Sequence, residues 1–390
     1  MINLFRDIPS SKPNFYFLAN GSKFYNNVEA FSEASKRRDS RIEFVLDYDV
    51  YRNPQAWRVE PLLESKDYFR KHARILAEKY DDITIHYSGG TDSHTILDAF
   101  IDEGIRNVKL WHRAGFGFED FNPKIKLFGQ IRDTLMSKYS EKLKQLNYTV
   151  EGLDKPNYLA PNDPAEWRLA LENFVGDYRT MVKLPESIGQ YHSRHKRVNK
   201  TKPRSCMIWG LEKPRVTLVN GDWFWATNSG MWWQYDTPSS NDYDTIFFFS
   251  TDDVPEIQIK LAWLKISAIE SIVKARGNIS KSEAEKLVSE VQHFSSSYYT
   301  LINESMGYKA LSHVLNGNYW RASPDYSGWL KHLHLKREKI GIIRETQHFF
   351  EEEISRRVDA RYIDEENKTL NSIPSRSIYI RKSTLELRDS

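Results

Sequence analysis

Residues 83–104 constrain the fold of this chain more than any other stretch, because they predict a strand, a glycine turn and a helix in that order. An apolar run over 83–87 leads into the turn, and apolar residues then recur at helical spacing. These residues are Ile96, Leu97, Phe100 and Ile101. Gly104 stands where a glycine is expected to end the helix. Two glycines in the turn let the backbone approach an anion, which the N–H groups and the dipole of the helix start would hold.

The turn differs from a Walker-type P-loop, which requires a lysine after its second glycine. No lysine occurs between Lys79 and Lys109. The turn resembles instead the S-G-G-x-D-S signature of the PP-loop ATP pyrophosphatases, an adenine nucleotide alpha hydrolase-like superfamily that includes asparagine synthetases, GMP and NAD synthetases and tRNA-modifying enzymes. All six positions match: Ser88, Gly89, Gly90, Thr91, Asp92 and Ser93.

The resemblance implies that ATP is cleaved between its α and β phosphates, releasing pyrophosphate and activating a substrate as an adenylate. It implies that the six residues of the signature bind the nucleotide and that Asp92 acts in catalysis and binds Mg²⁺. A short glycine turn before a helix can also be a tight connection that binds nothing.

A second glycine turn follows a predicted buried strand over 206–209. In the PP-loop enzymes a later strand ends in a glycine turn that faces the phosphates, and Gly210, Glu212, Lys213 and Arg215 match that position in order, though not its usual sequence. The resemblance implies that Gly210 helps to bind the nucleotide and that Glu212 shares Mg²⁺ with the first turn. Lys213 and Arg215 would neutralise the departing pyrophosphate as catalytic residues. The alternative is a surface turn with ordinary charges.

Strands and helices alternate around these turns, which predicts an α/β fold with a parallel sheet and helices on both faces, of the PP-loop or HUP type. Further strands are expected over 108–112, 148–150 and 246–249, and helices over 65–80 and 124–146. In such sheets ligands bind beyond the carboxyl ends of the strands, where Ser88 and His112 would lie. The resemblance places adenosine at the end of the second strand, so His112 is either a nucleotide contact or a bystander.

We expect three regions: an N-terminal α+β elaboration over 1–70, a PP-loop ATP pyrophosphatase domain over 71–256, and a mostly helical domain over 257–390. Asparagine synthetases carry a glutaminase domain whose nucleophile is a cysteine after the initiator methionine. Ile2 stands at that position, so no glutaminase domain is expected.

Local patterns predict further elements in the outer regions. Asn20-Gly21 predicts a hairpin between 14–18 and 23–25, followed by a helix over 30–38 and a strand over 42–46. The aromatic stretches 222–225 and 231–235 are expected to form a second hairpin around Asn228-Ser229-Gly230. Helical patterns cover 261–275, 281–304 and 331–360, and a final short strand is expected over 375–381.

Composition excludes several kinds of site. Cys206 is the single cysteine among 390 residues, so an internal disulfide and a zinc site built from several cysteines are both excluded. A net charge of +3 is too small to indicate nucleic acid or membrane binding by itself. The sequence shows neither an apolar run of about 18 residues nor a signal sequence, so a cytoplasmic protein without a membrane partner is expected.

Residues 190–215 carry eight Lys or Arg side chains against one acid, Glu212. Within this stretch, 192–204 is either a basic lid over triphosphate, a contact for tRNA or DNA, or a solvated loop.

Taken whole, the chain resembles the asparagine synthetase-like proteins of tailed bacteriophages, which would place it in a host cytoplasm. The expected function is an ATP- and Mg²⁺-dependent ligase that adenylates a carboxylate or carbonyl substrate for attack by ammonia or an amine. Two alternatives stay open: an enzyme that modifies a nucleic-acid base in tRNA or DNA, and a non-catalytic nucleotide-binding module. The sequence leaves the acceptor, the nitrogen donor and the oligomeric state undetermined.

Overall fold

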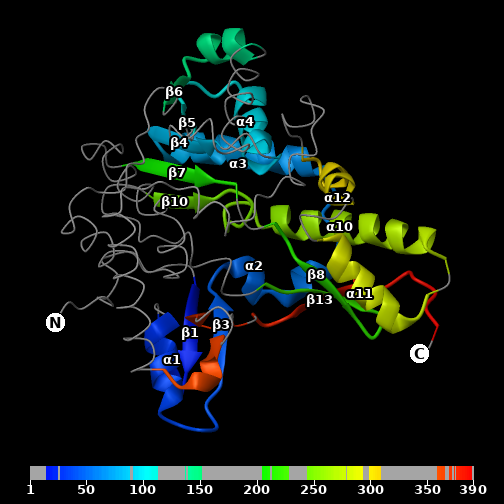
Figure 1. Cartoon of the computed structure of the whole chain (residues 1–390). Coiled ribbons are helices and arrows are strands. Elements are labelled where there is room, and N and C mark those ends of the chain that lie inside the picture. The colour runs from blue at the N-terminus through cyan, green and yellow to red at the C-terminus, as the bar shows by residue number, and fades with distance from the viewer. Residues whose placement is uncertain are drawn as a thin grey trace, which may run out of the picture.

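The structure is a computed structural model (Figure 1). It describes residues 15–24, 27–87, 91–112, 137, 139–151, 204–210, 213–227, 244–277, 279–292, 298–308, 358–364, 369–370, 373 and 375–388.

The main sheet has five parallel strands in the order β10-β7-β4-β5-β6. The strands are β4 (Asp82–Tyr87), β5 (Lys109–His112), β6 (Thr149–Glu151), β7 (Ser205–Trp209) and β10 (Asp244–Phe247). Every residue of β7 is buried, as expected for a strand that neighbouring strands and both faces of the sheet cover. The predicted α/β fold with a parallel sheet is confirmed.

The chain winds outward from the centre of this sheet in two directions. It begins at β4, adds β5 and β6 on one side, and then crosses over to add β7 and β10 on the other side. Counted along the chain, this is the doubly wound order 3-2-1-4-5, in which the direction of winding reverses between β4 and β7. Ligands of such sheets bind at the carboxyl edge beside this reversal point.

Three helices pack outward from this sheet: α4 (Thr91–Asp102) packs on β4, α3 (Ser65–Lys79) packs against α4, and α10 (Glu256–Ala275) packs against α3. The apolar face predicted for α4 is buried, because Ile96, Leu97, Phe100 and Ile101 all lie in the core. Gly104 has a φ of +66°, and Ile105 N–H donates to the Phe100 carbonyl at 3.1 Å, so the predicted glycine C-cap is present. Residues 139–145 are helical, within the helix predicted over 124–146, most of which lies outside the described residues.

The N-terminal region forms a separate antiparallel sheet beside α1 (Asn27–Ser35). Its strands are β1 (Phe15–Ala19), β2 (Ser22–Phe24) and β3 (Ile42–Leu46). The predicted hairpin is confirmed, since Asn20 and Gly21 both have positive φ, as a type I′ turn requires. A short helix α2 (Asp49–Arg52) and a 3₁₀ turn η1 (Pro54–Arg58) connect this sheet to α3.

A segment from late in the chain packs against α1. It contains η3 (Ala360–Tyr362), β11 (Ile363–Asp364) and β12 (Thr369–Leu370), which lie beside α1 at the bottom of Figure 1. The Arg361 guanidinium donates to the carbonyl oxygens of Ala34, Arg37 and Arg38 at the end of α1. These bonds attach the segment to the end of α1 and to the turn that follows it.

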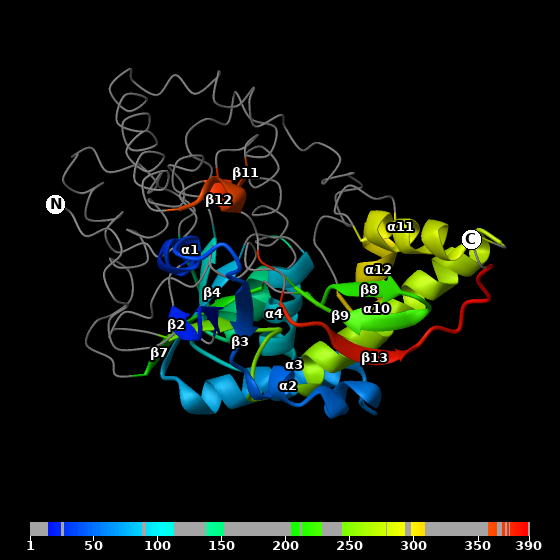
Figure 2. The same cartoon turned by 90° about the horizontal axis from the view of Figure 1, so that it is seen from below.

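A third sheet corrects one prediction from the sequence. Its order is β13-β9-β8, with β8 (Val216–Val219), β9 (Asp222–Trp225) and β13 (Ile378–Lys382) (Figure 2). The hairpin turn falls at Asn220-Gly221, where both residues have positive φ. The expected hairpin between 222–225 and 231–235 is wrong, because β9 already has antiparallel partners on both edges.

The region after residue 256 begins with helices, as predicted. After α10 come α11 (Lys281–Val291), which opens with a capping box between Ser280 and Glu283, and α12 (Tyr299–Ser305). The expected helix over 331–360 lies outside the described residues except at 358–360. The final strand predicted over 375–381 is found as β13. None of the helices among the described residues combines the length and apolar character that crossing a membrane requires.

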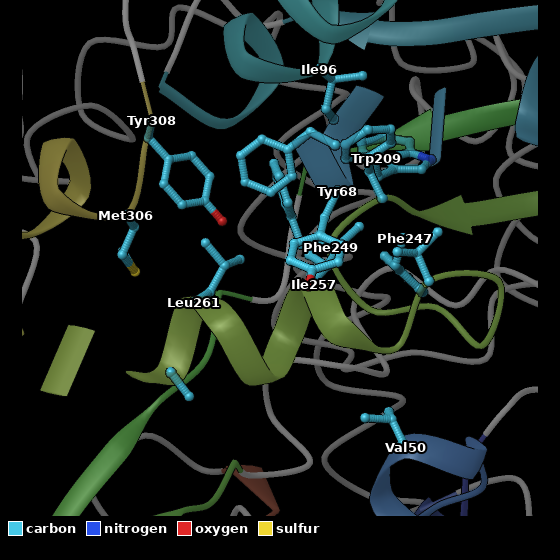
Figure 3. Packing of buried hydrophobic residues seen from close by; sticks show 14 of the residues in the cluster. Val50, Tyr68, Ile96, Trp209, Phe247, Phe249, Ile257, Leu261, Met306 and Tyr308 are labelled. Atoms are coloured by element: carbon cyan, nitrogen blue, oxygen red, sulfur yellow. The ribbon is translucent and has the colours of Figure 1, made fainter. Parts of the chain in front are cut away.

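One apolar cluster runs through all three predicted regions, from Phe15 of β1 to Ile380 of β13. Figure 3 shows its centre, where Ile257 and Leu261 of α10 lie near Phe249 and Tyr308. The boundaries drawn after residues 70 and 256 stay predictions.

Candidate active site

The turn after β7 lies directly against the first turn of α4. A Cβ atom built on Gly210 would lie 2.9 Å from Asp92 Cβ, 3.0 Å from the Asp92 carbonyl carbon and 3.0 Å from Ser93 N. These separations are shorter than real Cβ contacts, so a residue without a side chain lets the strand come this close. The contact joins the two glycine motifs at the carboxyl edge, beside the reversal point between β4 and β7.

Asp92 and Lys213 form an ion pair at this contact. Lys213 Nζ lies 2.7 Å from Asp92 Oδ1, and the side chains are 14% and 30% exposed, respectively. Burial raises the pKa of the Asp92 carboxyl, while the charge and hydrogen bond of Lys213 act against that rise. Asp92 also lies in the first turn of α4, where the helix dipole favours a negative charge. The structure therefore brings together two residues that the sequence analysis assigned to the site.

Lys213 has two further partners, which the sequence analysis missed. Its ammonium donates to Asn303 Oδ1 at 3.0 Å and lies 4.7 Å from the centre of the Tyr308 ring. Asn303 belongs to α12, and Tyr308 follows this helix. Both lie far along the chain from Lys213, and the helical pattern around Asn303 carries no sign of such a contact.

A third missed residue, Lys265 of α10, approaches the same turn. Its side chain is buried, and its Nζ donates to the Pro214 carbonyl oxygen at 2.9 Å. Burial, together with repulsion from Lys213 and Arg215, lowers the pKa of Lys265 to about 7, while Asp92 acts in the opposite direction. Lys265 interrupts the apolar pattern of the helix predicted over 261–275, and this is the feature of the sequence that could have identified it.

The charges around this turn favour an anion. Lys213, Arg215 and Lys265 interact electrostatically with one another, and Asp92 is the acid that acts on Lys265. The N–H groups at the start of α4 add further positive potential at the same edge of the sheet. A phosphate group fits this combination of cations and helix terminus.

A buried polar network supports the end of β4 behind the site. The Tyr87 hydroxyl lies 3.1 Å from His94 Nδ1, and the Tyr139 hydroxyl lies 3.2 Å from His94 Nε2. Burial raises the pKa of both tyrosine hydroxyls, so they stay protonated. The network holds Tyr87, at the end of β4, against His94 of α4.

The remaining predicted residues differ in position. The side chains of Thr91 and Ser93 are buried in the first turn of α4. The N–H groups of a first helical turn have no partner within the helix, so these groups, and not the side chains, are the candidates for binding a ligand. His112 ends β5 and is paired in register with Tyr87, at the expected edge of the sheet. Arg215 is exposed just before β8, and its carbonyl oxygen accepts from Ala226 N–H at 3.2 Å.

Several predicted site residues lie outside the described residues: Ser88, Gly89, Gly90 and Glu212. The basic stretch 192–204 also lies outside them, apart from Arg204. Arg204 pairs with Asp81 at 2.8 Å, at the amino-terminal edge of the sheet and away from the candidate site.

The described residues contain no group of three or more His, Cys, Asp or Glu side chains that could hold a metal ion. Magnesium usually needs one or two carboxylates together with phosphate oxygens and water. Asp92, partly exposed at a helix start, is a carboxylate of the kind that could hold a Mg²⁺ ion together with a phosphate. Cys206 is buried within β7, and burial raises the pKa of its thiol, which makes it a poor ligand.

No family model matches the chain, and neither a curated protein nor a solved structure matches it. The functional assignment therefore depends on the residues and the geometry described above.

Proposed function

We propose that this chain is an ATP-dependent ligase that adenylates a carboxylate or carbonyl substrate, releasing pyrophosphate, for attack by ammonia or an amine. The observation that supports this proposal best is the Asp92–Lys213 ion pair, held where Gly210 contacts the first turn of α4. An acid and a lysine at this edge of a doubly wound sheet suit the binding and cleavage of a polyphosphate. We propose a cytoplasmic location, in a host cell if the protein is encoded by a phage.

In the proposed reaction, an oxygen of the acceptor attacks the α-phosphorus of ATP and the bond to the β-phosphate oxygen breaks. The leaving pyrophosphate gains negative charge, which the Lys213 ammonium beside the start of α4 stabilises, with Arg215 close by. The nitrogen nucleophile then attacks the activated carbon, and AMP leaves. The chain supplies position and electrostatic stabilisation in this scheme, without a protein nucleophile.

Other residues would bind the nucleotide. The glycine turn 88–90 and the N–H groups of Thr91, Asp92 and Ser93 are proposed to hold phosphate oxygens, with Gly210 keeping the second turn close. His112 is proposed to lie near the adenosine. Asp92, with Glu212 as a second candidate, would hold Mg²⁺, which supplies charge neutralisation for the phosphates.

The proposal is tested by incubating the protein with ATP, Mg²⁺ and pools of candidate acceptors, including carboxylic acids, tRNA and DNA, and separating the nucleotides by chromatography. AMP and pyrophosphate formed with one pool would support the proposal and identify the substrate class. A requirement for tRNA or DNA would identify the base-modifying alternative. ADP and phosphate would contradict the PP-loop assignment, and binding without cleavage in every pool would favour the non-catalytic module.

Variants connect the outcome to this site. Asp92→Asn and Lys213→Met are expected to lower AMP formation by about a hundredfold or more, because each removes a charge that acts on the phosphates. The matched control breaks the exposed Arg204–Asp81 pair at the opposite edge with Arg204→Met, and wild-type activity is expected. Full activity in both site variants would refute the assignment.

A further inference from the structure

The two partners of Lys213 from α12 and the turn that follows it carry no net charge. One is the amide oxygen of Asn303, 3.0 Å from the ammonium, and the other is the face of the Tyr308 ring, 4.7 Å away. An amide oxygen accepts a hydrogen bond from an ammonium, and an aromatic face attracts it through the ring quadrupole. Neither neutralises the lysine charge as a carboxylate does.

Both partners are fixed by the core. Asn303 is only 3% exposed and Tyr308 only 1%, and Tyr308 N–H donates to the Asn303 carbonyl at 3.0 Å. The Tyr308 ring packs against Phe249 and Phe69, with ring centres 5.0 and 5.9 Å away. Figure 3 shows Tyr308 beside Leu261 of α10.

The turn between these two residues is attached to the start of α3. Ser65 Oγ donates to the Met306 carbonyl at 2.8 Å. Gly307 has a φ of +84°, and a Cβ built on it would lie 2.4 Å from Ser65 Oγ. A side chain at this position would therefore disturb the turn, so glycine is required both by the backbone and by the space. Asn303 and Tyr308 consequently present a rigid surface to Lys213.

We propose that Asn303 and Tyr308 are positioning residues that form a neutral cradle for Lys213. The cradle keeps the ammonium beside the first turn of α4 while leaving its charge available to an anionic ligand. Asp92 can then change partners without releasing the lysine into solvent. This inference rests on the proposed function, because it concerns the cation that would act on the phosphates, and it makes α12 part of the site.

The chemistry of the cradle gives an unusual expectation for Asn303→Asp. A carboxylate at this position would pair with Lys213, which offsets the cost of burying a charge where Asn303 is only 3% exposed, and it would also repel a phosphate. We therefore expect an affinity lower by about tenfold or more for α,β-methylene-ATP with Mg²⁺, together with a thermal midpoint close to that of wild type. A residue with a merely structural role would change stability and affinity in the same direction.

The experiment measures thermal unfolding without ligand, and the affinity for α,β-methylene-ATP with Mg²⁺ by titration calorimetry. The matched control is Ser305→Asp, which adds the same charge on the exposed side of α12 and is expected to leave affinity within about twofold of wild type. Asn303→Ala and Tyr308→Leu are expected to weaken binding by several-fold, because each removes one of the two groups that hold the ammonium.

The outcomes separate this inference from the proposed function. Wild-type affinity in Asn303→Asp and Asn303→Ala, with binding lost in Lys213→Met, would overturn the cradle and leave the proposed function standing. Wild-type affinity in Lys213→Met as well would overturn both. If Asn303→Asp does not fold, Asn303→Ala and Tyr308→Leu decide, because wild-type affinity in both of these variants would overturn the cradle.

Discussion

Replacing Gly210 by alanine tests whether the site depends on the close contact between β7 and α4. The added Cβ would lie 2.9–3.0 Å from backbone and Cβ atoms of residues 92 and 93, whereas ordinary contacts begin at 3.4 Å. These neighbours are not flexible side-chain ends, so the strand and the helix start would have to separate by about 0.5 Å.

The expected free-energy cost follows from this overlap. Forcing an extra carbon into a packed contact costs about 1–3 kcal/mol, and the reduced freedom of the unfolded chain returns about 0.4–1 kcal/mol. We therefore expect Gly210→Ala to lower the free energy of unfolding by about 1–2 kcal/mol. The same displacement moves Asp92 relative to Lys213, and the affinity for nucleotide is therefore expected to fall by about tenfold.

Denaturant unfolding and nucleotide titration measure the two effects. The control is Gly277→Ala at the end of α10, where φ is +84° and no atom lies within 4 Å of the added Cβ. This control is expected to lose about 1–2 kcal/mol through backbone strain alone, with nucleotide affinity unchanged. Wild-type stability and affinity in Gly210→Ala would refute the reasoning, because the contact would then tolerate a side chain.

Three further predictions concern buried groups. Burial raises the pKa of Glu270, but hydrogen bonds led by that from Arg381 outweigh it and lower the pKa to about 2 from 4.5. The ionised Glu270 carboxylate therefore stabilises the folded protein by about 3 kcal/mol, fully above pH 4.5 and less and less as the pH falls toward 2. Denaturant titrations of wild type and Glu270→Gln should show a difference in the free energy of unfolding that shrinks over that pH range. Burial, the largest cause, lowers the pKa of Lys265 to about 7 from 10.5. The free energy of unfolding of wild type relative to Lys265→Met should therefore rise from pH 7 to pH 10. A difference that does not depend on pH would contradict the burial of this amine. Burial raises the pKa of Cys206, so an alkylating reagent followed by mass spectrometry should modify it only in unfolded protein, and rapid labelling of the native state would count against its position in β7.

Local patterns were sufficient to predict most of the central fold. Alternation of strands and helices indicated the parallel sheet, and single residues such as Gly21 and Gly104 marked turns whose positive φ the structure confirms. Such signals act over a few residues, so they do not depend on how distant segments pack.

The partner of β9 could not be predicted in the same way. Two turn signals flank this strand, Asn220-Gly221 and Asn228-Ser229-Gly230, and the sequence analysis chose the second. The structure places the hairpin at the first and pairs the other edge of β9 with β13, from the end of the described chain. Pairing across such a separation is decided by packing and leaves no local mark.

In the candidate site, too, local signals identified some residues, while residues brought in by distant packing were missed. Gly210 and Lys213 were identified because they follow a strand end, and the structure brings both to Asp92. Asn303 lies 90 residues beyond Lys213 in the chain, and no spacing rule connects the two. The residues that fix the site from outside the sheet were therefore invisible until the helices were placed.

The pairing of β9 with β13 has a consequence for synthesis of the protein on the ribosome. Residues 222–225 emerge long before residues 378–382, so one edge of β9 stays uncovered through most of the remaining translation. The strand carries Trp223 and Trp225, both buried in the finished protein, and an aromatic strand with an uncovered edge is prone to pair with other chains. A nascent chain halted near residue 256 would also lack the helices that hold Lys213. We expect such intermediates to depend on chaperones. We also expect a chain without residues 378–382 to give a lower yield of soluble protein than the full chain.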